Sequence, residues 1–209
     1  MPRPATGLTL AIACAQLVEH ISSDAALSQL SQSSQFKDRW EALGQSHGRL
    51  LDSIREVARP NKDGSFGTAT LCSLVRQLTP SDSIYAIEAV TNTPIVADQI
   101  QANVPGQWLN CGSGGLGWSS AGALGIKLAS DAIQGNGPKK VVIQIVGDGS
   151  FMFSIRLSAF WISHRYEIPN LTIVLNNRGW NAPRVSMELV HPDGLGSQVS
   201  NDELNIAFS

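Results

Sequence analysis

Residues 141–177 read VVIQIVGDGSFMFSIRLSAFWISHRYEIPNLTIVLNN, and this stretch decides the fold. Val141–Val146 is almost continuously apolar, which is typical of a strand buried on both faces of a parallel sheet. The pattern that follows predicts a helix over Phe151–Tyr166 and a second strand over Leu171–Leu175. Strand, helix and strand in this order indicate an α/β fold with a doubly wound, mainly parallel sheet flanked by helices.

Both predicted strands end in polar residues that could bind a ligand. Gly147-Asp148-Gly149 follows the first strand, and Asn176-Asn177 follows the second. Because parallel strands present their carboxyl ends to one crevice, Asp148 and Asn177 should lie side by side. Carboxylate and amide oxygens are hard ligands of the kind that Mg²⁺ takes. Either motif alone could be an ordinary turn or helix cap, but the two together predict a metal site.

The two motifs, separated by residues 150–175, resemble the magnesium motif of thiamine-diphosphate enzymes. The surrounding stretch is similar to the pyrophosphate-binding domain of acetolactate synthase, benzoylformate decarboxylase and pyruvate decarboxylase. Upstream, WLNCGSGGLGWSSAGALGIKLA at residues 108–129 resembles the tryptophan-plus-glycine segment of that family. The resemblance covers roughly residues 65–180. It implies the thiamine-diphosphate-binding fold, and decarboxylation or carboligation of 2-keto acids as the reaction.

The resemblance also implies thiamine diphosphate and Mg²⁺ as cofactors. Asp148, the Asn177 side chain and the backbone carbonyl of Gly179 would hold the metal. Two diphosphate oxygens and one water would complete the octahedron that Mg²⁺ demands.

The other implied residues contact the cofactor itself. Gly147 and Gly149 let the chain turn off its strand, and Gly149 and Ser150 open a helix whose free N–H groups face the diphosphate. Thr91 and Asn92, which follow an expected strand at Ser83–Ala89, are the other residues expected near the diphosphate. In the same turn, the role of Glu88 stays open: the residue could be a helix cap, a surface group or a ligand.

The glycine loop has two interpretations. By resemblance, Gly115, Leu116, Gly117 and Trp118 run beneath the aminopyrimidine ring, and the side chain of Leu116 or Trp118 wedges the cofactor into a bent shape. Alternatively, Gly112–Gly117 fits the G-x-G-x-x-G pattern of an NAD(P)- or flavin-binding Rossmann module. Asp148 follows this loop at more than the roughly 20 residues usual for that fingerprint, and the Rossmann interpretation leaves the asparagine pair unused.

The chain is expected to have two parts. Residues 1–60 read as a helical N-terminal segment, with helices over Leu8–Ile21 and Phe36–Ala58 and a Ser- and Gln-rich loop over Ser22–Gln35. The turn Asn61–Gly64 marks the boundary. Residues 61–209 are the expected pyrophosphate domain, which we expect to be truncated at its carboxyl end.

A catalytic residue is not assigned to this chain. In the family, a pyrimidine-binding domain supplies the glutamate that activates the cofactor, and no acid within residues 1–60 has the strand context for that role. We therefore expect a homo- or hetero-oligomer with a subunit that carries this domain, a small 2-keto acid as substrate, and little activity of the isolated chain. The alternative is a non-catalytic or regulatory subunit, or a fragment, that retains the fold.

Composition excludes several other classes. The formal net charge of −2 over 209 residues gives no electrostatic reason for a nucleic-acid or membrane partner. Three cysteines without a CxxC pair argue against a disulfide framework and against structural zinc. Leu8–Ala15 could pass for a weak signal peptide, but a buried helix fits it better, so we expect an intracellular, cytoplasmic location with an organelle left open.

Overall fold

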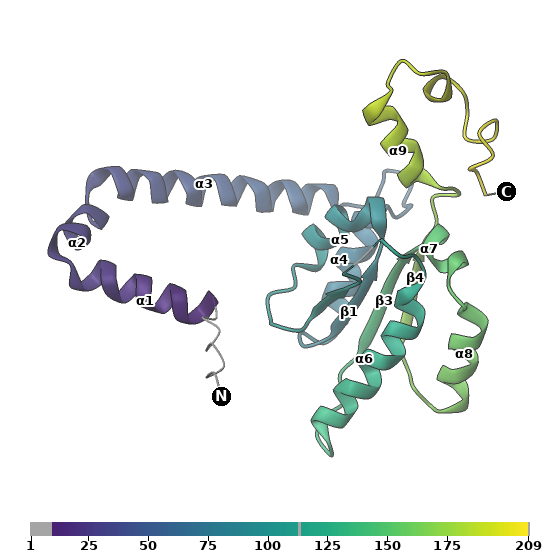
Figure 1. The fold of residues 1–209 in the computed structure, drawn as a ribbon, viewed down its shortest axis with the longest axis horizontal. Helices are drawn as coiled ribbons and strands as arrows, with labels where there is room; N and C mark the ends of the chain where they lie inside the picture. The colour runs from purple at the N-terminus through teal and green to yellow at the C-terminus, as the bar shows by residue number, and fades with distance from the viewer. Residues whose placement is uncertain (1–9, 113, 209) are drawn as a thin grey trace, which may run out of the picture. The chain divides into compact units, whose positions relative to one another are not determined.

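The computed structural model describes residues 10–112 and 114–208. The chain divides into two compact units, Met1–Arg55 and Glu56–Ser209 (Figure 1). In the described part of the chain, no helix combines the length and the apolar character needed to cross a membrane.

The described part of the first unit is helical: α1 covers Leu10–Ser23, α2 covers Ala25–Ser31, and α3 covers Ser34–Val57 and runs past the unit boundary. Leu8, where the first expected helix begins, lies outside the described residues. None of the described side chains on these helices is buried. These three helices therefore contribute little hydrophobic core, and they lack the packing that gives most helices in proteins their stability.

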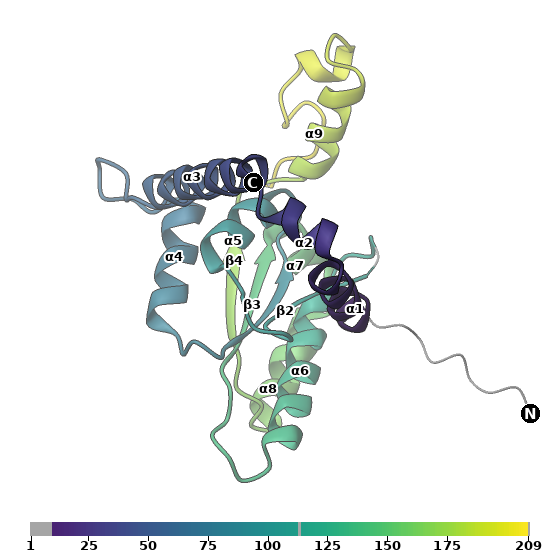
Figure 2. The same cartoon turned by 90° about the vertical axis from the view of Figure 1, so that its left-hand side faces the viewer.

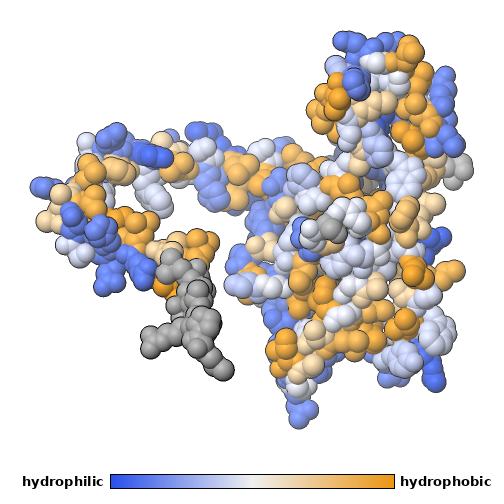
Figure 3. Space-filling model, in the orientation of Figure 1, coloured by the Kyte–Doolittle hydropathy of each residue, from blue (hydrophilic) through white to orange (hydrophobic). Residues whose placement is uncertain are grey.

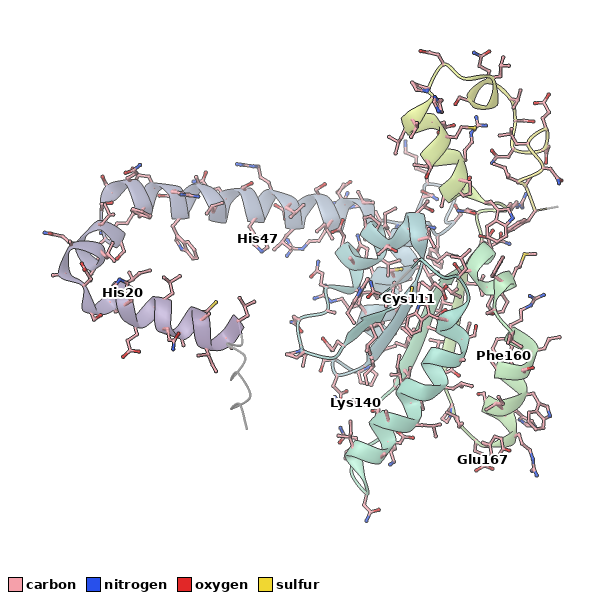
Figure 4. All side chains as sticks on the ribbon, viewed as in Figure 1. His20, His47, Cys111, Lys140, Phe160 and Glu167 are labelled. Atoms are coloured by element: carbon pink, nitrogen blue, oxygen red, sulfur yellow. The ribbon has the colours of Figure 1, made fainter. Side chains whose placement is uncertain are left out.

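The loop expected over Ser22–Gln35 is wrong, because α2 occupies its middle. The Asp24 carboxylate accepts a hydrogen bond of 2.9 Å from the backbone N–H of Leu27. An aspartate in this position satisfies a free N–H of the first helical turn, and such a cap starts a helix even in a polar sequence. His20 on α1 and His47 on α3 are both exposed (Figure 4).

The second unit alternates strands and helices. Its elements in chain order are α4 (Thr68–Leu78), β1 (Ile84–Glu88), the short 3-10 helix η1 (Val90–Asn92), α5 (Thr93–Ile100), β2 (Trp108–Asn110), α6 (Trp118–Gln134), β3 (Val142–Gly147), α7 (Asp148–Phe153), α8 (Arg156–Arg165), β4 (Leu171–Leu175), α9 (Asn181–Val190) and a second 3-10 helix, η2 (Leu195–Gln198).

Within the described residues, the four strands form one parallel sheet in the order β2-β1-β3-β4 (Figure 2). Helices α4 and α5 cover one face, where Cys72, Val96 and Ile145 belong to the main apolar cluster. Helix α6 covers the other face through Ala123, which packs with Ala86 and other apolar residues of the sheet. This arrangement confirms the prediction of a parallel sheet flanked by helices.

One expectation for the segment after β3 is wrong. The single helix expected over Phe151–Tyr166 is split into α7 and α8 at Ser154, whose backbone is extended. The Ser154 hydroxyl donates to the carbonyl of Phe151 at 2.7 Å and lies 3.0 Å from the hydroxyl of Ser120 on α6. A serine bonded in this way competes with the helical ladder, so the helix ends there. Strand β4 lies at the edge of the sheet, and its Val174 is 37% exposed.

Exposed apolar side chains gather over α6 and α8, on the face seen in Figure 3. Leu128 and Ile133 contribute from α6, and Leu157 and Phe160 from α8. Phe160 is labelled in Figure 4. Only a small cluster that includes Leu124 joins the two helices. Helix α8 therefore packs less completely on the sheet than α6 does.

Burial of Cys72 predicts an alkaline loss of stability. Desolvation raises the pKa of this thiol to about 11, from an ordinary value of 9.0. Because the folded-state pKa lies above the unfolded value, the stabilisation is complete below about pH 9 and is lost as the pH rises towards 11. We expect the free energy of unfolding to fall by about 2–3 kcal/mol over this range. Urea denaturation should show a weaker pH dependence for Cys72→Ala, and equal slopes would contradict the prediction.

Two glycines at α6 predict opposite effects of the same substitution. Gly117 precedes the helix with φ +94°, and a Cβ there would lie 2.9 Å from the backbone Cα of Ser154. Gly117→Ala should therefore lower the free energy of unfolding by about 1–3 kcal/mol. Gly125 lies within α6 with open space around it, so Gly125→Ala should raise it by about 0.5–1 kcal/mol. Chemical denaturation measures both, and a loss of stability in Gly125→Ala or none in Gly117→Ala would contradict this account.

Candidate functional site

The sheet contains a topological switch point between β1 and β3. From β1 the chain moves outwards to β2, whereas from β3 it moves outwards in the opposite direction to β4. The register pairs Glu88 with Val146 and Gly147 with Leu175. The turns that follow β1, β3 and β4 therefore meet at one edge of the sheet, where open α/β sheets bind their ligands.

A cavity of about 390 Å³ opens at this edge. Its walls come from the turn after β1, the glycine loop, the start of α7, the loop after β4 and the start of α9. The predicted site residues that line it are Thr91, Asn92, Leu116, Gly147, Asp148, Gly149, Ser150, Asn177 and Gly179. The fold thus brings together residues that lie far apart in the sequence.

Three residues predicted in the glycine loop are not among the described residues that line the cavity: Gly115, Gly117 and Trp118. Trp118 is the first residue of α6, and it packs against the apolar cluster beneath that helix. Leu116, in contrast, lines the cavity and is 38% exposed. Of the two side chains expected to wedge a cofactor, only Leu116 is placed to do so.

The Asp148 carboxylate is buried at the start of α7 and is held by main-chain donors. Its Oδ1 accepts from the N–H of Gly149 at 2.9 Å, and its Oδ2 accepts from the N–H of Gly179 at 3.3 Å. We expected the Gly149 N–H to face a diphosphate, but it donates its hydrogen bond to Asp148. The bond from Gly179 ties the loop after β4 to the end of β3.

Two oxygen-bearing groups, the Asn177 amide and the Gly179 carbonyl, converge next to the Asp148 carboxylate. One end of the Asn177 amide lies 3.2 Å from Asp148 Oδ1 and 3.0 Å from the carbonyl oxygen of Gly179. An amide nitrogen at that position donates to both acceptors. After a half-turn of the amide, its oxygen joins them and the three oxygens form a set that a cation can bind. The same groups can thus satisfy one another without a metal and can coordinate one when it is present.

The chemistry of these donors suits Mg²⁺. One carboxylate, one amide and one carbonyl provide three hard oxygens and leave positions for phosphate oxygens and water. Among the described residues there is no group of three or more His, Cys, Asp or Glu side chains that could hold a metal. A site rich in nitrogen or sulfur ligands, as zinc prefers, is therefore not present in the described part of the chain.

Close packing explains two glycines at this site, Gly149 and Gly179. A Cβ on Gly149 would lie 2.6 Å from the ring of Trp180, which covers this turn. A Cβ on Gly179 would lie 2.7 Å from the carbonyl oxygen of Ile206. Both positions need a residue without a side chain because other parts of the structure approach the backbone closely.

Sequence reasoning missed the partners of the loop after β4. The N–H of Trp180 donates to the carbonyl of Ile206 at 2.8 Å, and the N–H of Phe208 donates to the carbonyl of Arg178 at 2.7 Å. The Trp180 ring also meets Phe208 and Phe153 edge to face, with centroids 5.1 and 6.2 Å apart. These contacts join segments separated by more than twenty residues, and no local pattern signals them.

The start of α9 was also missed as a wall of the cavity. Ala182, Pro183 and Ser186 line it together with Trp180 and Asn181. The proline near the start of a helix was the available signal for α9, but it does not reveal which side of the helix faces a cavity.

Comparison with known proteins identifies the family to which this chain is similar. The family described as "Thiamine pyrophosphate enzyme, C-terminal TPP binding domain" matches residues 89–208. Benzoylformate decarboxylase of Pseudomonas aeruginosa is 28% identical over 147 residues, which are 65% of this chain and 26% of that protein.

Two solved structures share the fold. A thiamine diphosphate-dependent 4-hydroxybenzoylformate decarboxylase of Rhodococcus jostii RHA1 matches with a TM-score of 0.54 and 31% identity, over 62% of this chain and 23% of that one. Benzoylformate decarboxylase of Polynucleobacter necessarius matches with a TM-score of 0.55 and 21% identity, over 62% of this chain and 24% of that one. The chain thus spans about a quarter of the length of these relatives.

The family match covers more than half of the chain and includes the whole lining of the cavity. The chain therefore belongs to the thiamine pyrophosphate enzymes, as a representative of their C-terminal TPP-binding domain.

Proposed function

We propose that residues 61–209 form a cofactor domain that binds thiamine diphosphate through Mg²⁺. The observation that carries this proposal is the convergence of the Asp148 carboxylate, the Asn177 amide and the Gly179 carbonyl at the switch point of the sheet. The metal would sit among these three groups and bind two oxygens of the diphosphate. Its role is to anchor the cofactor, since the ligand set includes only one protein charge.

The two ends of the cofactor would meet different walls of the cavity. Thr91 and Asn92 follow β1 and, with Ser150, offer polar groups to the diphosphate beside the metal. Leu116 and Trp180 line the same cavity and offer apolar surface to the organic part of the cofactor and to the substrate. The polar and apolar walls together orient a molecule that has one charged end and one ring end.

The proposed reaction is decarboxylation or carboligation of a 2-keto acid. When bound, thiamine diphosphate supplies the carbon nucleophile and the electron sink that such a reaction needs. Relatives named for benzoylformate and 4-hydroxybenzoylformate favour an aromatic 2-keto acid as substrate. This chain would bind the cofactor, orient it and keep water from the reacting end.

Activation of the cofactor would need a group from another domain. Asp148 is the only acid among the described residues that line the cavity, and the metal site employs it. We therefore propose that a partner subunit with a pyrimidine-binding domain completes the site, in a homo- or hetero-oligomer.

Replacing the metal-binding aspartate tests the proposal directly. Asp148→Ala should lower the Mg²⁺-dependent affinity for thiamine diphosphate by about 100-fold or more, because it removes the only charged ligand. Isothermal titration calorimetry with and without Mg²⁺ measures this change. Asp98→Ala is the matched control, since Asp98 is an exposed acid on α5 outside the cavity. Equal binding by wild type and Asp148→Ala would remove Asp148 from the metal site and overturn the proposal.

The need for a partner predicts that the pure chain does not decarboxylate benzoylformate in the presence of Mg²⁺ and thiamine diphosphate. Mixing it with a full-length relative whose own metal-binding aspartate is replaced by alanine should restore turnover. Rapid turnover by the pure chain would refute the requirement for a partner. Cofactor binding without any restored turnover would instead favour a non-catalytic subunit.

A further inference from the structure

Glu88 is buried at the end of β1, where only 6% of its surface is exposed. Its Oε1 accepts from the N–H of Gly117 at 2.6 Å, and its Oε2 accepts from the N–H of Ser119 at 2.9 Å. The sequence left this residue open between a cap, a surface group and a ligand. The structure makes it a cap of α6, contributed by a strand that lies about thirty residues earlier in the chain.

The start of α6 compensates the buried charge. The first N–H groups of a helix have no partner within the helix, and the helix dipole favours a negative charge beside them. None of the described basic side chains forms an ion pair with Glu88. A buried carboxylate is tolerated when hydrogen bonds satisfy its oxygens, so Glu88 and the start of α6 depend on each other.

This contact joins two walls of the cavity. The turn that follows Glu88 directly, Ala89–Asn92, forms one wall, and Gly114 and Leu116 of the glycine loop belong to the other. Gly117, at the end of that loop, is fixed both by Glu88 and by close approach to the backbone of Ser154. The position of the loop over the cavity therefore depends on the Glu88 carboxylate.

A buried polar network extends the contact into the sheet. Gln144 of β3 donates from Nε2 to the hydroxyl of Ser119 at 2.8 Å, and its Oε1 accepts from Thr172 of β4 at 2.9 Å. Ser119 and Gln144 are almost fully buried. The start of α6 is thus anchored to β1, β3 and β4, and no member of this network is a ligand of the proposed metal.

We infer that Glu88 is a positioning residue that holds the glycine loop, and with it the wall that takes the organic end of the cofactor. The inference rests on the proposed function. It assigns separate supports to the two ends of the cavity: Asp148 and its loop to the diphosphate, and Glu88 with α6 to the ring. Loss of Glu88 should therefore weaken binding of the whole cofactor while sparing binding of its diphosphate part.

The test compares two probes, thiamine diphosphate and inorganic pyrophosphate, each with Mg²⁺, by calorimetry on the full chain. Glu88→Gln presents an amide N–H₂ to one of the two N–H donors, and Glu88→Asp is one methylene too short to reach both. Each variant should bind thiamine diphosphate about tenfold more weakly than wild type, equivalent to about 1.4 kcal/mol, and should bind pyrophosphate with unchanged affinity.

Ser83→Ala controls for a general loss of stability. Ser83 is fully buried and directly precedes β1, at the end of the strand opposite to Glu88. Its hydroxyl donates to the carbonyl of Pro80 at 2.7 Å. This variant should lose stability and keep both affinities. Equal loss of both probes in the Glu88 variants, or loss of neither, would overturn the positioning role. Failure of wild type to bind thiamine diphosphate would instead overturn the proposed function.

Hydrogen exchange of the Gly117 and Ser119 amides tests the loop without any ligand. Both amides should exchange at least about tenfold faster in Glu88→Gln than in wild type, while amides paired between β1 and β3 keep their rates. Unchanged exchange at Gly117 and Ser119 would show that Glu88 does not hold the loop, whatever the binding experiments give.

Discussion

The parallel pairing of β3 with both of its neighbours determines where every polar group of the cavity lies. The register places Glu88 beside Val146 and Gly147 beside Leu175, so three strands end at the same level. The four apolar residues of β3 are fully buried. A slip by one residue would move Gln144 to the other face of the sheet, away from Ser119 and Thr172, to which it is hydrogen-bonded. The core of the sheet thus fixes the strand ends that precede Asp148 and Asn177.

Close backbone approach is the second constraint on the site. Trp180 can cover the turn at Gly149, and the chain near Ile206 can pair beside Gly179, only because neither glycine has a side chain. The edge-to-face contact of Trp180 with Phe208 also holds the loop after β4. In this way the carbonyl of Gly179 and the amide of Asn177 gain a fixed position, although both belong to a loop.

The sequence revealed those parts of the site that local patterns encode. The buried strands and the polar residues at their ends predict the sheet and the meeting of Asp148 with Asn177, because both follow from strand periodicity and parallel geometry. The break between α7 and α8 was not predictable, since it depends on a contact of Ser154 with Ser120 on another helix. The packing of Trp118 into the core escaped for the same reason. The sequence left the role of Glu88 open, because the choice of a cap among its alternatives also depends on distances between elements.

The carboxyl edge of the sheet contains two buried carboxylates, and their hydrogen bonds differ in a way that fits the separate roles proposed for them. Both oxygens of Glu88 accept short bonds, of 2.6 and 2.9 Å, from the start of α6. Asp148 accepts one such bond of 2.9 Å and a long one of 3.3 Å, and the Asn177 amide and the Gly179 carbonyl converge beside it. A cation therefore binds more favourably at Asp148, whose lone pairs are less fully used in hydrogen bonds. Binding at Glu88 would break its hydrogen bonds to the start of α6. Asp148 thus keeps lone pairs that a metal could use, whereas both oxygens of Glu88 are bound to backbone N–H groups of the protein.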